Sequence, residues 1–277
     1  MTYATLMVHL QPGRSNAAVL AMTHRLAVRH EAAVIGMVAT QPIQIQMGDG
    51  AMSADLYRLD AEEMAVEISK AEAEFRQALT ADVAKLEWRS ASLMTSLAER
   101  IACEARSADL LISAVDESGY CDNMRRVVTS DLVMQAGRPV LLVPALAHGA
   151  RTDRVMVAWK DTREARRAVV DALPLLRSAT QVSLVEVRGN TEPERSASVL
   201  RLDELAVWLK RHGITADCRS EHATSSDAAV LATLGEELQI DLTVAGAYGH
   251  SRLREWALGG VTRDLLVSGR RCSLLSC

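Results

Sequence analysis

The chain has 277 residues, of which 49% are hydrophobic and 24% are charged, and its formal net charge is −4. This length suffices for one large or two modest domains, and the apolar content supports a substantial core. The slight negative charge disfavours attraction to nucleic acid or to an anionic membrane, and no apolar run reaches the ~20 residues that span a bilayer.

The first residues are typical of a strand rather than of a leader sequence, because residues 1–10 contain neither a basic segment nor a cleavage site. The five cysteines form no Cys-x-x-Cys pair, and the seven histidines show no metal-ligand spacing. We therefore expect a cytoplasmic protein whose cysteines are reduced and fill the core, and which binds no metal at a site of its own.

Short apolar segments alternate with helical patterns along the chain, which predicts βαβ units on a parallel sheet. Helices are expected after the first strand of each half, from residues 14 and 163, and over residues 60–79, where acidic and basic residues alternate on a solvated face. In chain order, strands are expected near residues 5–10, 33–39, 107–114 and 137–144, and again near 154–159, 181–187, 239–246 and 269–276.

The second series of strands repeats the first, which indicates that the chain is a tandem of two similar halves. A small, polar segment containing Gly and Pro, residues 144–153, predicts the linker between them. We expect two α/β domains, residues 1–146 and 152–277. The first is longer because of extra residues between about 41 and 80.

A glycine-rich segment follows the apolar residues 241–245, which are typical of a buried strand. Its glycines are Gly246, Gly249, Gly259 and Gly260. Glycine permits a positive φ and lets a ligand oxygen approach the backbone closely, and a following helix points its free N–H groups at the loop. We interpret the segment as a phosphate cradle, although glycines that serve only as turn and cap residues are the plainer alternative.

The spacing Gly-x2-Gly-x9-Gly, with Gly249-His-Ser and Leu258-Gly-Gly-Val-Thr262, resembles the nucleotide loop of the universal stress protein family. The resemblance covers essentially the whole chain. It implies two tandem flavodoxin-like (Rossmann-like) α/β domains, each with a mostly parallel five-stranded sheet flanked by helices. It also implies ATP, with or without magnesium, in the C-terminal domain. The residues that it marks for cofactor binding are Gly246, Gly249, His250, Gly259, Gly260, Val261, Thr262, Asp161 and Val187.

Two positions depart from the family pattern. Gly260 stands where relatives carry Ser or Thr, and Thr262 offers a hydroxyl two residues later. Lys160 stands where relatives carry an Asp that holds the nucleoside, and Asp161 follows it. Either Asp161 takes that role while Lys160 approaches a phosphate, or nucleoside recognition is impaired. Asp161 or Thr162 could equally cap the next helix, and Val187 could equally be a core residue.

The first half has lost the glycines of this loop. The aligned residues of the two halves are Ala114, Glu117, Val127 and Val128 against Gly246, Gly249, Gly259 and Gly260. A non-glycine residue in the left-handed region costs roughly 1–2 kcal/mol, and Glu117 would place a negative charge where a phosphate should lie. We therefore expect nucleotide binding in the second half only.

The leading functional hypothesis is a stress-response module that binds ATP or a related adenine nucleotide and changes its conformation or its protein partner, with little turnover. A tandem scaffold that has lost the ligand and a slow ATPase are the alternatives. Turnover would require a positioned base or metal ligands. His250 and Asp264 lie nearby, but the chain has no paired carboxylates there and no Walker-type Gly-Lys-Thr.

The resemblance also implies how the halves assemble. Tandem chains of this kind pack as an intramolecular pseudo-dimer in which the last strands, here residues 140–143 and 272–275, meet at their edges. An exposed apolar edge strand needs a partner. A homodimer of the whole chain and an unidentified protein partner are implied by the family alone.

Overall fold

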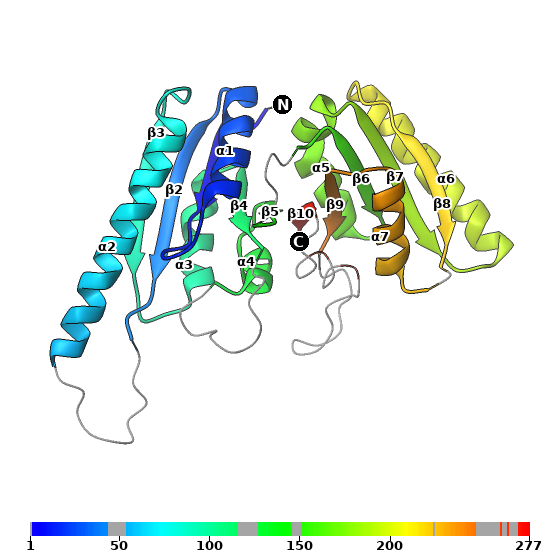
Figure 1. The fold of residues 1–277 in the computed structure, drawn as a ribbon. Helices are drawn as coiled ribbons and strands as arrows, with labels where there is room; N and C mark the ends of the chain where they lie inside the picture. Colours follow the sequence, from blue (N-terminus) through cyan, green and yellow to red (C-terminus); the bar gives the residue numbers. More distant parts are fainter. Residues whose placement is uncertain are drawn as a thin grey trace, which may run out of the picture. The chain divides into compact units, whose positions relative to one another are not determined.

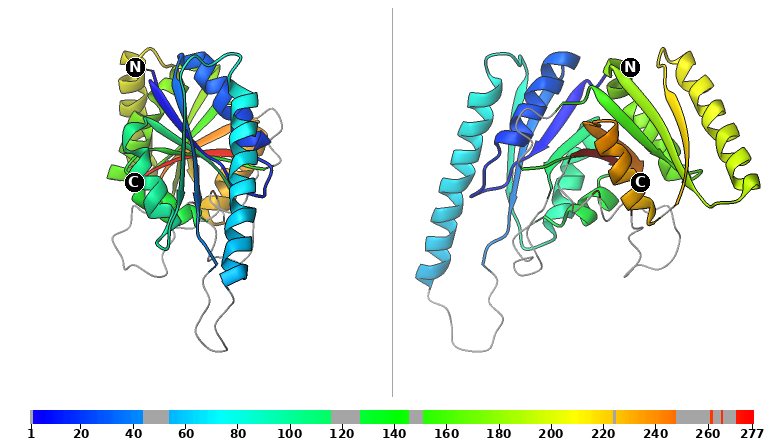
Figure 2. Two further views of the ribbon diagram at one scale, coloured as in Figure 1. Left: turned by 90° about the vertical axis from the view of Figure 1, so that its left-hand side faces the viewer. Right: turned by 45° about the vertical axis from the view of Figure 1, so that its right-hand side comes forward.

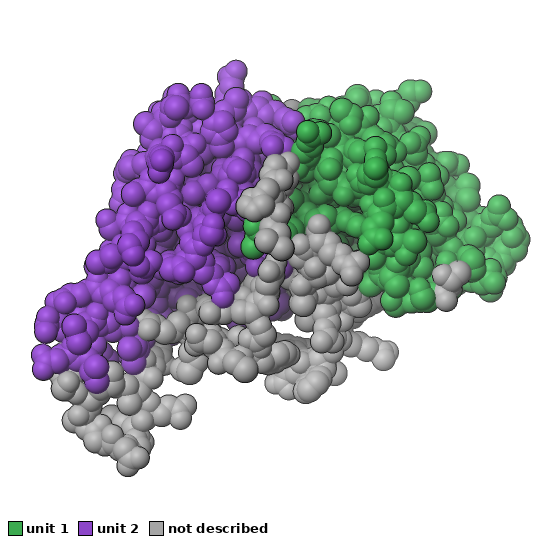
Figure 3. All heavy atoms as spheres, viewed as in Figure 1, with its two compact units in different colours: residues 1–2, 139–277 green, residues 3–138 purple. Residues whose placement is uncertain are grey.

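The computed structural model describes residues 2–43, 54–115, 127–145, 151–223, 225–247, 261, 265 and 271–277. The chain divides into two compact units, coloured separately in Figure 3. The N-terminal unit is Tyr3–Arg138, and the C-terminal unit is Pro139–Cys277 together with residues 1–2.

The N-terminal unit is a parallel sheet with the strand order β3-β2-β1-β4 (Figure 1). Its central strands are continuous apolar runs because helices cover both faces of the sheet, whereas the edge strand β3 alternates in exposure. Its elements are β1 (Thr5–His9), α1 (Ala17–His30), β2 (Ala33–Thr40), α2 (Ala54–Leu79), β3 (Leu86–Ser92), α3 (Leu97–Glu104), the 3-10 turn η1 (Ala105–Ser107), β4 (Leu110–Ala114) and α4 (Thr129–Gln135).

The C-terminal unit has the strand order β5-β10-β9-β6-β7-β8, in which only the pair β5 and β10 is antiparallel among the described strands. The expected meeting of the last strands of the two halves is confirmed by this pair. The elements are β5 (Val140–Val143), β6 (Arg154–Trp159), α5 (Arg163–Ser178), β7 (Gln181–Arg188), α6 (Glu192–Arg211), β8 (Asp217–His222), α7 (Asp227–Glu237), β9 (Leu242–Gly246) and β10 (Cys272–Ser276).

Right-handed crossovers place the helices of each unit on two faces of its sheet. In the N-terminal unit the chain runs outward through β1, β2 and β3 and then returns to β4, so α1 and α2 cover one face and α3 and α4 the other (Figure 2). The C-terminal unit repeats this pattern, with α5 and α6 on one face and α7 on the other. The expected fold class, a mostly parallel sheet flanked by helices, is thereby confirmed.

The pairing register of the central strands is also the same in the two halves. Leu6 on β1 pairs with Leu110 on β4, and Val155 on β6 pairs with Leu242 on β9. Each position of one crevice therefore has a definite counterpart in the other. The compact units divide before β5, whereas the predicted domains divide between residues 146 and 152, so the domain limits defined by the repeat stay a prediction.

Two expectations differ from the structure. The charged helix begins at Ala54 rather than at residue 60, because residues 54–59 continue its helical pattern. Of the cysteines that the structure describes, Cys272 is buried, but Cys103, Cys218 and Cys277 are exposed and do not fill the core. Cys103 lies on the solvent face of α3, and Cys218 lies on the edge strand β8. No described helix has both the length and the apolar content needed to cross a membrane.

Candidate functional site

The carboxyl ends of β6, β7 and β9 form the crevice where the sequence predicts a ligand. The strand order reverses at β6, because the chain passes to β7 on one side while β9 lies on the other. At such a reversal the following helices lie on opposite faces, which leaves an opening beyond the strand ends. Residues after β6, at the end of β7 and at the end of β9 therefore share one edge of the sheet.

Gly246 ends β9 and lies directly under the first turn of α5. A Cβ atom at this position would lie 2.4 Å from the backbone nitrogen of Ala165 and 2.5 Å from the carbonyl carbon of Glu164. Its φ is not in the left-handed region. Gly246 is therefore required by the close approach of a helix to a strand, and not by a positive φ.

The start of α5 resolves the alternatives for Asp161 and Thr162. Thr162 is the N-cap residue, and its Oγ1 accepts a hydrogen bond of 3.3 Å from the backbone N–H of Ala165. Asp161 does not cap the helix, because its carboxylate pairs with the guanidinium of Arg166. The Asp161 side chain is 53% exposed, so it remains accessible at the strand end.

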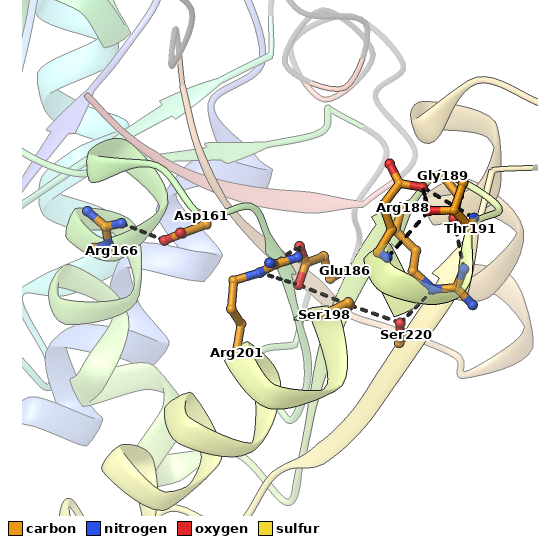
Figure 4. A network of polar contacts seen from close by, with 10 residues as sticks. Asp161, Arg166, Glu186, Arg188, Gly189, Thr191, Ser198, Arg201 and Ser220 are labelled. Atoms are coloured by element: carbon orange, nitrogen blue, oxygen red, sulfur yellow. Dashed lines mark hydrogen bonds and ion pairs between the residues drawn. The ribbon is translucent and has the colours of Figure 1, made fainter. Parts of the chain in front are cut away.

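An ion pair with a buried carboxylate and a partly exposed guanidinium lies beside Asp161 on the face covered by α5 and α6 (Figure 4). The carboxylate of Glu186 on β7 accepts hydrogen bonds from the Nη2 of Arg201, at 2.5 Å, and from the Oγ of Ser198, at 3.1 Å. The hydrogen bond to Glu186 raises the pKa of Arg201, and the charge of Asp161 adds to this effect. Asp161 therefore lies in a cationic environment between Arg166 and Arg201.

The ion pair belongs to a longer chain of polar contacts that ties α6 to the strands. Ser220 on β8 donates a hydrogen bond of 2.9 Å to Ser198, and Arg188 Nε donates one of 2.9 Å to Ser220. Because the partners come from β7, β8 and α6, the network holds the strand ends in a fixed position.

Val187 and Val261 lie on the opposite face, which α7 covers. Both are partly buried and pack against the same apolar cluster, which includes Met156 and Val185. Successive residues of a strand point to opposite faces, so Glu186 and Val187 are separated by the sheet. The structure thus places Val187 and Val261 on the same face of the sheet. Asp161 lies at the same edge of the sheet but on the opposite face, with Arg166 and Arg201.

The remaining predicted residues lie outside the described part of the chain: Gly249, His250, Gly259, Gly260 and Thr262. Their roles stay predictions. In the first half Glu117 also lies outside it, whereas Val128 is described and is extended, with φ −71° and ψ 113°. Among the described residues, no group of three or more His, Cys, Asp or Glu side chains is placed to hold a metal ion.

Sequence reasoning missed a polar pair in the N-terminal unit. His9, at the end of β1, is 2% exposed, and its Nδ1 lies 3.0 Å from the Oγ of Ser113 on β4. The counterparts in the C-terminal unit are Ala158 and Ala245, which are in register. The available signal was a polar residue near the carboxyl end of each of two otherwise apolar strands.

These observations define the class of the protein: a tandem α/β protein with flavodoxin-like sheets and a crevice at each reversal of strand order. Structures with the same architecture along the whole chain include a universal stress protein from Archaeoglobus fulgidus DSM 4304, which is 14% identical with a TM-score of 0.75 and covers 99% of this chain and 98% of that chain. A protein of unknown function from Pseudomonas aeruginosa PAO1 is 13% identical with a TM-score of 0.66 and covers 99% of this chain and 92% of that chain.

At these identities the likeness shows the fold alone: the chain has the fold of a tandem universal stress protein. A universal stress protein in complex with cAMP is 21% identical and covers 52% of this chain and 98% of that chain, with a TM-score of 0.38, which is too low to argue about a ligand here. No protein-family model and no curated protein matches the chain.

Proposed function

We propose that the chain is a universal stress protein that binds ATP or a related adenine nucleotide in its C-terminal unit. The observation that carries the proposal is the parallel order β9-β6-β7, which brings Gly246, Asp161 and Val187 to one edge of the sheet. The sequence then places a glycine-rich loop directly after Gly246. A cytoplasmic location and a homodimer belong to the proposal through the family resemblance.

The described residues suit the nucleoside part of such a ligand. Val187 and Val261 give an apolar surface for the base, and the accessible carboxylate of Asp161 can accept hydrogen bonds from ribose hydroxyls. The ion pair with Arg166 orients that carboxylate.

The phosphate part of the proposal depends on the loop sequence. Gly249, Gly259 and Gly260 would expose backbone N–H groups to the phosphates, Thr262 would add a hydroxyl, and His250 would pack against the loop. Magnesium, where present, would be held mainly by the phosphates, as is usual for this ion with nucleotides. The output is a change of conformation or partner rather than turnover.

Isothermal titration of nucleotide-free protein with ATP tests this proposal. Gly249→Val should weaken ATP binding at least about tenfold, because a β-branched side chain both blocks the backbone approach and resists a positive φ. Gly119→Val, the same change in the loop of the first half, is the matched control and should leave the affinity unchanged. Absence of any heat with wild-type protein would refute the proposal.

A scaffold that has lost its ligand is the second candidate, and two observations favour it. Gly246 has a packing reason that needs no ligand, and Asp161 already has a partner in Arg166. Mass spectrometry of freshly purified protein under native conditions separates the candidates. Bound adenylate at near-unit occupancy supports the nucleotide-binding protein and excludes the scaffold.

A further inference from the structure

The N-terminal unit has its own crevice, built differently from the one in the C-terminal unit. Its strand order reverses between β1 and β4, where Val8 pairs with Ile112. The next residues in register are His9 and Ser113, so their hydrogen bond spans the reversal point. This is the position at which an open parallel sheet is expected to take a ligand.

A cavity of about 250 Å³ lies at this point and is lined in part by His9. It is smaller than the roughly 300–1,000 Å³ of sites for drug-sized ligands. A compact molecule therefore fits this cavity.

The chemistry of the lining limits the ligand further. Apolar side chains form much of the wall, and Thr40 and Gln41 add neutral polar groups. Among the described residues that line this cavity, Arg14 is the only charged one, and it is exposed to solvent. The described part of the wall therefore offers no buried charge to an ionic ligand, whose desolvation it would leave uncompensated.

His9 supplies the directional contact. Burial lowers the pKa of its imidazole to about 4, so the ring is neutral at pH 7 and carries one N–H and one lone pair. Ser113 engages Nδ1, which fixes the orientation of the ring and leaves Nε2 as the nitrogen for a ligand.

The wall is already ordered by contacts within the unit. Asn16, which is 4% exposed, accepts a hydrogen bond of 2.8 Å from the backbone N–H of Gln11 and donates one of 3.1 Å to Glu74 on α2. Gly13 allows the intervening turn with φ +69°. The loop between β1 and α1 is thus tied to α2 without a ligand.

We propose that the N-terminal unit binds a small uncharged molecule, an apolar body with one hydrogen-bonding head group, in the cavity beside His9. The head group contacts Nε2 of His9, and the apolar body lies against the aliphatic wall. This site is separate from the proposed nucleotide site and uses no phosphate contact. An experiment that refutes one of the two proposals therefore leaves the other standing.

Benzamide and benzoate are a matched pair of probes, since they share shape and size and differ in charge. In NMR titrations of the full chain we expect benzamide to bind with a Kd of about 1 mM, a value that a ligand of about nine non-hydrogen atoms can reach. Benzoate should bind at least about tenfold more weakly. The imidazole signal that stays neutral at pH 5 and is lost in His9→Ala should shift with benzamide.

His9→Ala should weaken benzamide binding about fivefold or more, the effect of one hydrogen bond. Alanine occupies the equivalent position in the other unit, at Ala158, so the strand accepts it. His24→Ala is the matched control, because His24 lies in the same unit but is exposed and pairs with Asp82. If His9→Ala fails to fold, Ser113→Ala keeps the ring and should still weaken binding. No benzamide binding at about 10 mM, equal binding of benzoate, or unchanged affinity in the folded variant would overturn the proposal.

Discussion

The two crevices of this protein occupy equivalent positions in the sheet but are lined by different residues. Where the N-terminal unit has the hydrogen-bonded pair His9 and Ser113, the C-terminal unit has Ala158 and Ala245. Where the N-terminal strand β4 ends in Ala114, β9 ends in Gly246. Under the two proposals, the sheet fixes where a ligand binds, and these few side chains decide the size and charge of the ligand.

Among the substitutions, the largest effect on stability is expected at the end of β9. Gly246→Ala should destabilise the protein by about 2–3 kcal/mol, because the new Cβ would overlap the backbone of α5. The reverse change at the matched position, Ala114→Gly, should cost only about 0.5–1 kcal/mol. Urea unfolding followed by circular dichroism measures both. Equal costs would show that the two strand ends are packed alike.

Because His9 is buried, we expect the free energy of unfolding to depend on pH. The pKa of His9 is about 4 in the folded state against 6.5 ordinarily, so between these values the unfolded chain binds a proton that the folded chain does not. Stability therefore falls as pH is lowered from about 7 to 4, by up to about 3 kcal/mol from this group.

His9→Ala should flatten that part of the curve of unfolding free energy against pH. A wild-type slope that persists in His9→Ala would assign the pH dependence to other groups.

The smallest effects concern the start of α5, where Thr162 caps the helix and ligand binding is proposed for Asp161. Thr162→Ala should cost about 1 kcal/mol of stability, because a helix cap is lost. Asp161→Ala should cost less than about 0.5 kcal/mol, since its pair with Arg166 is exposed, but it should weaken ATP binding. Thermal unfolding and titration with ATP separate the two roles. Equal loss of ATP affinity in both variants would contradict the assignment.

Much of the fold could be predicted from the sequence because it repeats. Apolar strands at matching positions in both halves indicate a parallel sheet, and the structure confirms them at β1, β4, β6 and β9. The reason for Gly246 could not be predicted, since it depends on how closely α5 approaches β9. The pair of His9 and Ser113 was missed because these residues are 104 positions apart and meet only through strand register.

Asp161 and Val187 show what the sequence leaves open about the faces of the sheet. The sequence marked Asp161 and Val187 as parts of one site, and the structure brings both to the same edge of the sheet. However, Asp161 lies with Arg166 and Arg201, whereas Val187 packs on the opposite face with Val261. A sequence pattern locates the end of a strand reliably. The face of the sheet on which a side chain lies is harder to predict, because a shift of one residue along the strand moves the side chain to the other face.

Hydrogen exchange measured by mass spectrometry, with and without saturating ATP, tests the central claim most directly, because it reports on both units in one experiment. The account predicts slower exchange in peptides that cover residues 158–163 and 246–262, and unchanged exchange in peptides that cover residues 5–14 and 110–130. Protection by ATP in the N-terminal peptides, with none in the C-terminal ones, would contradict it.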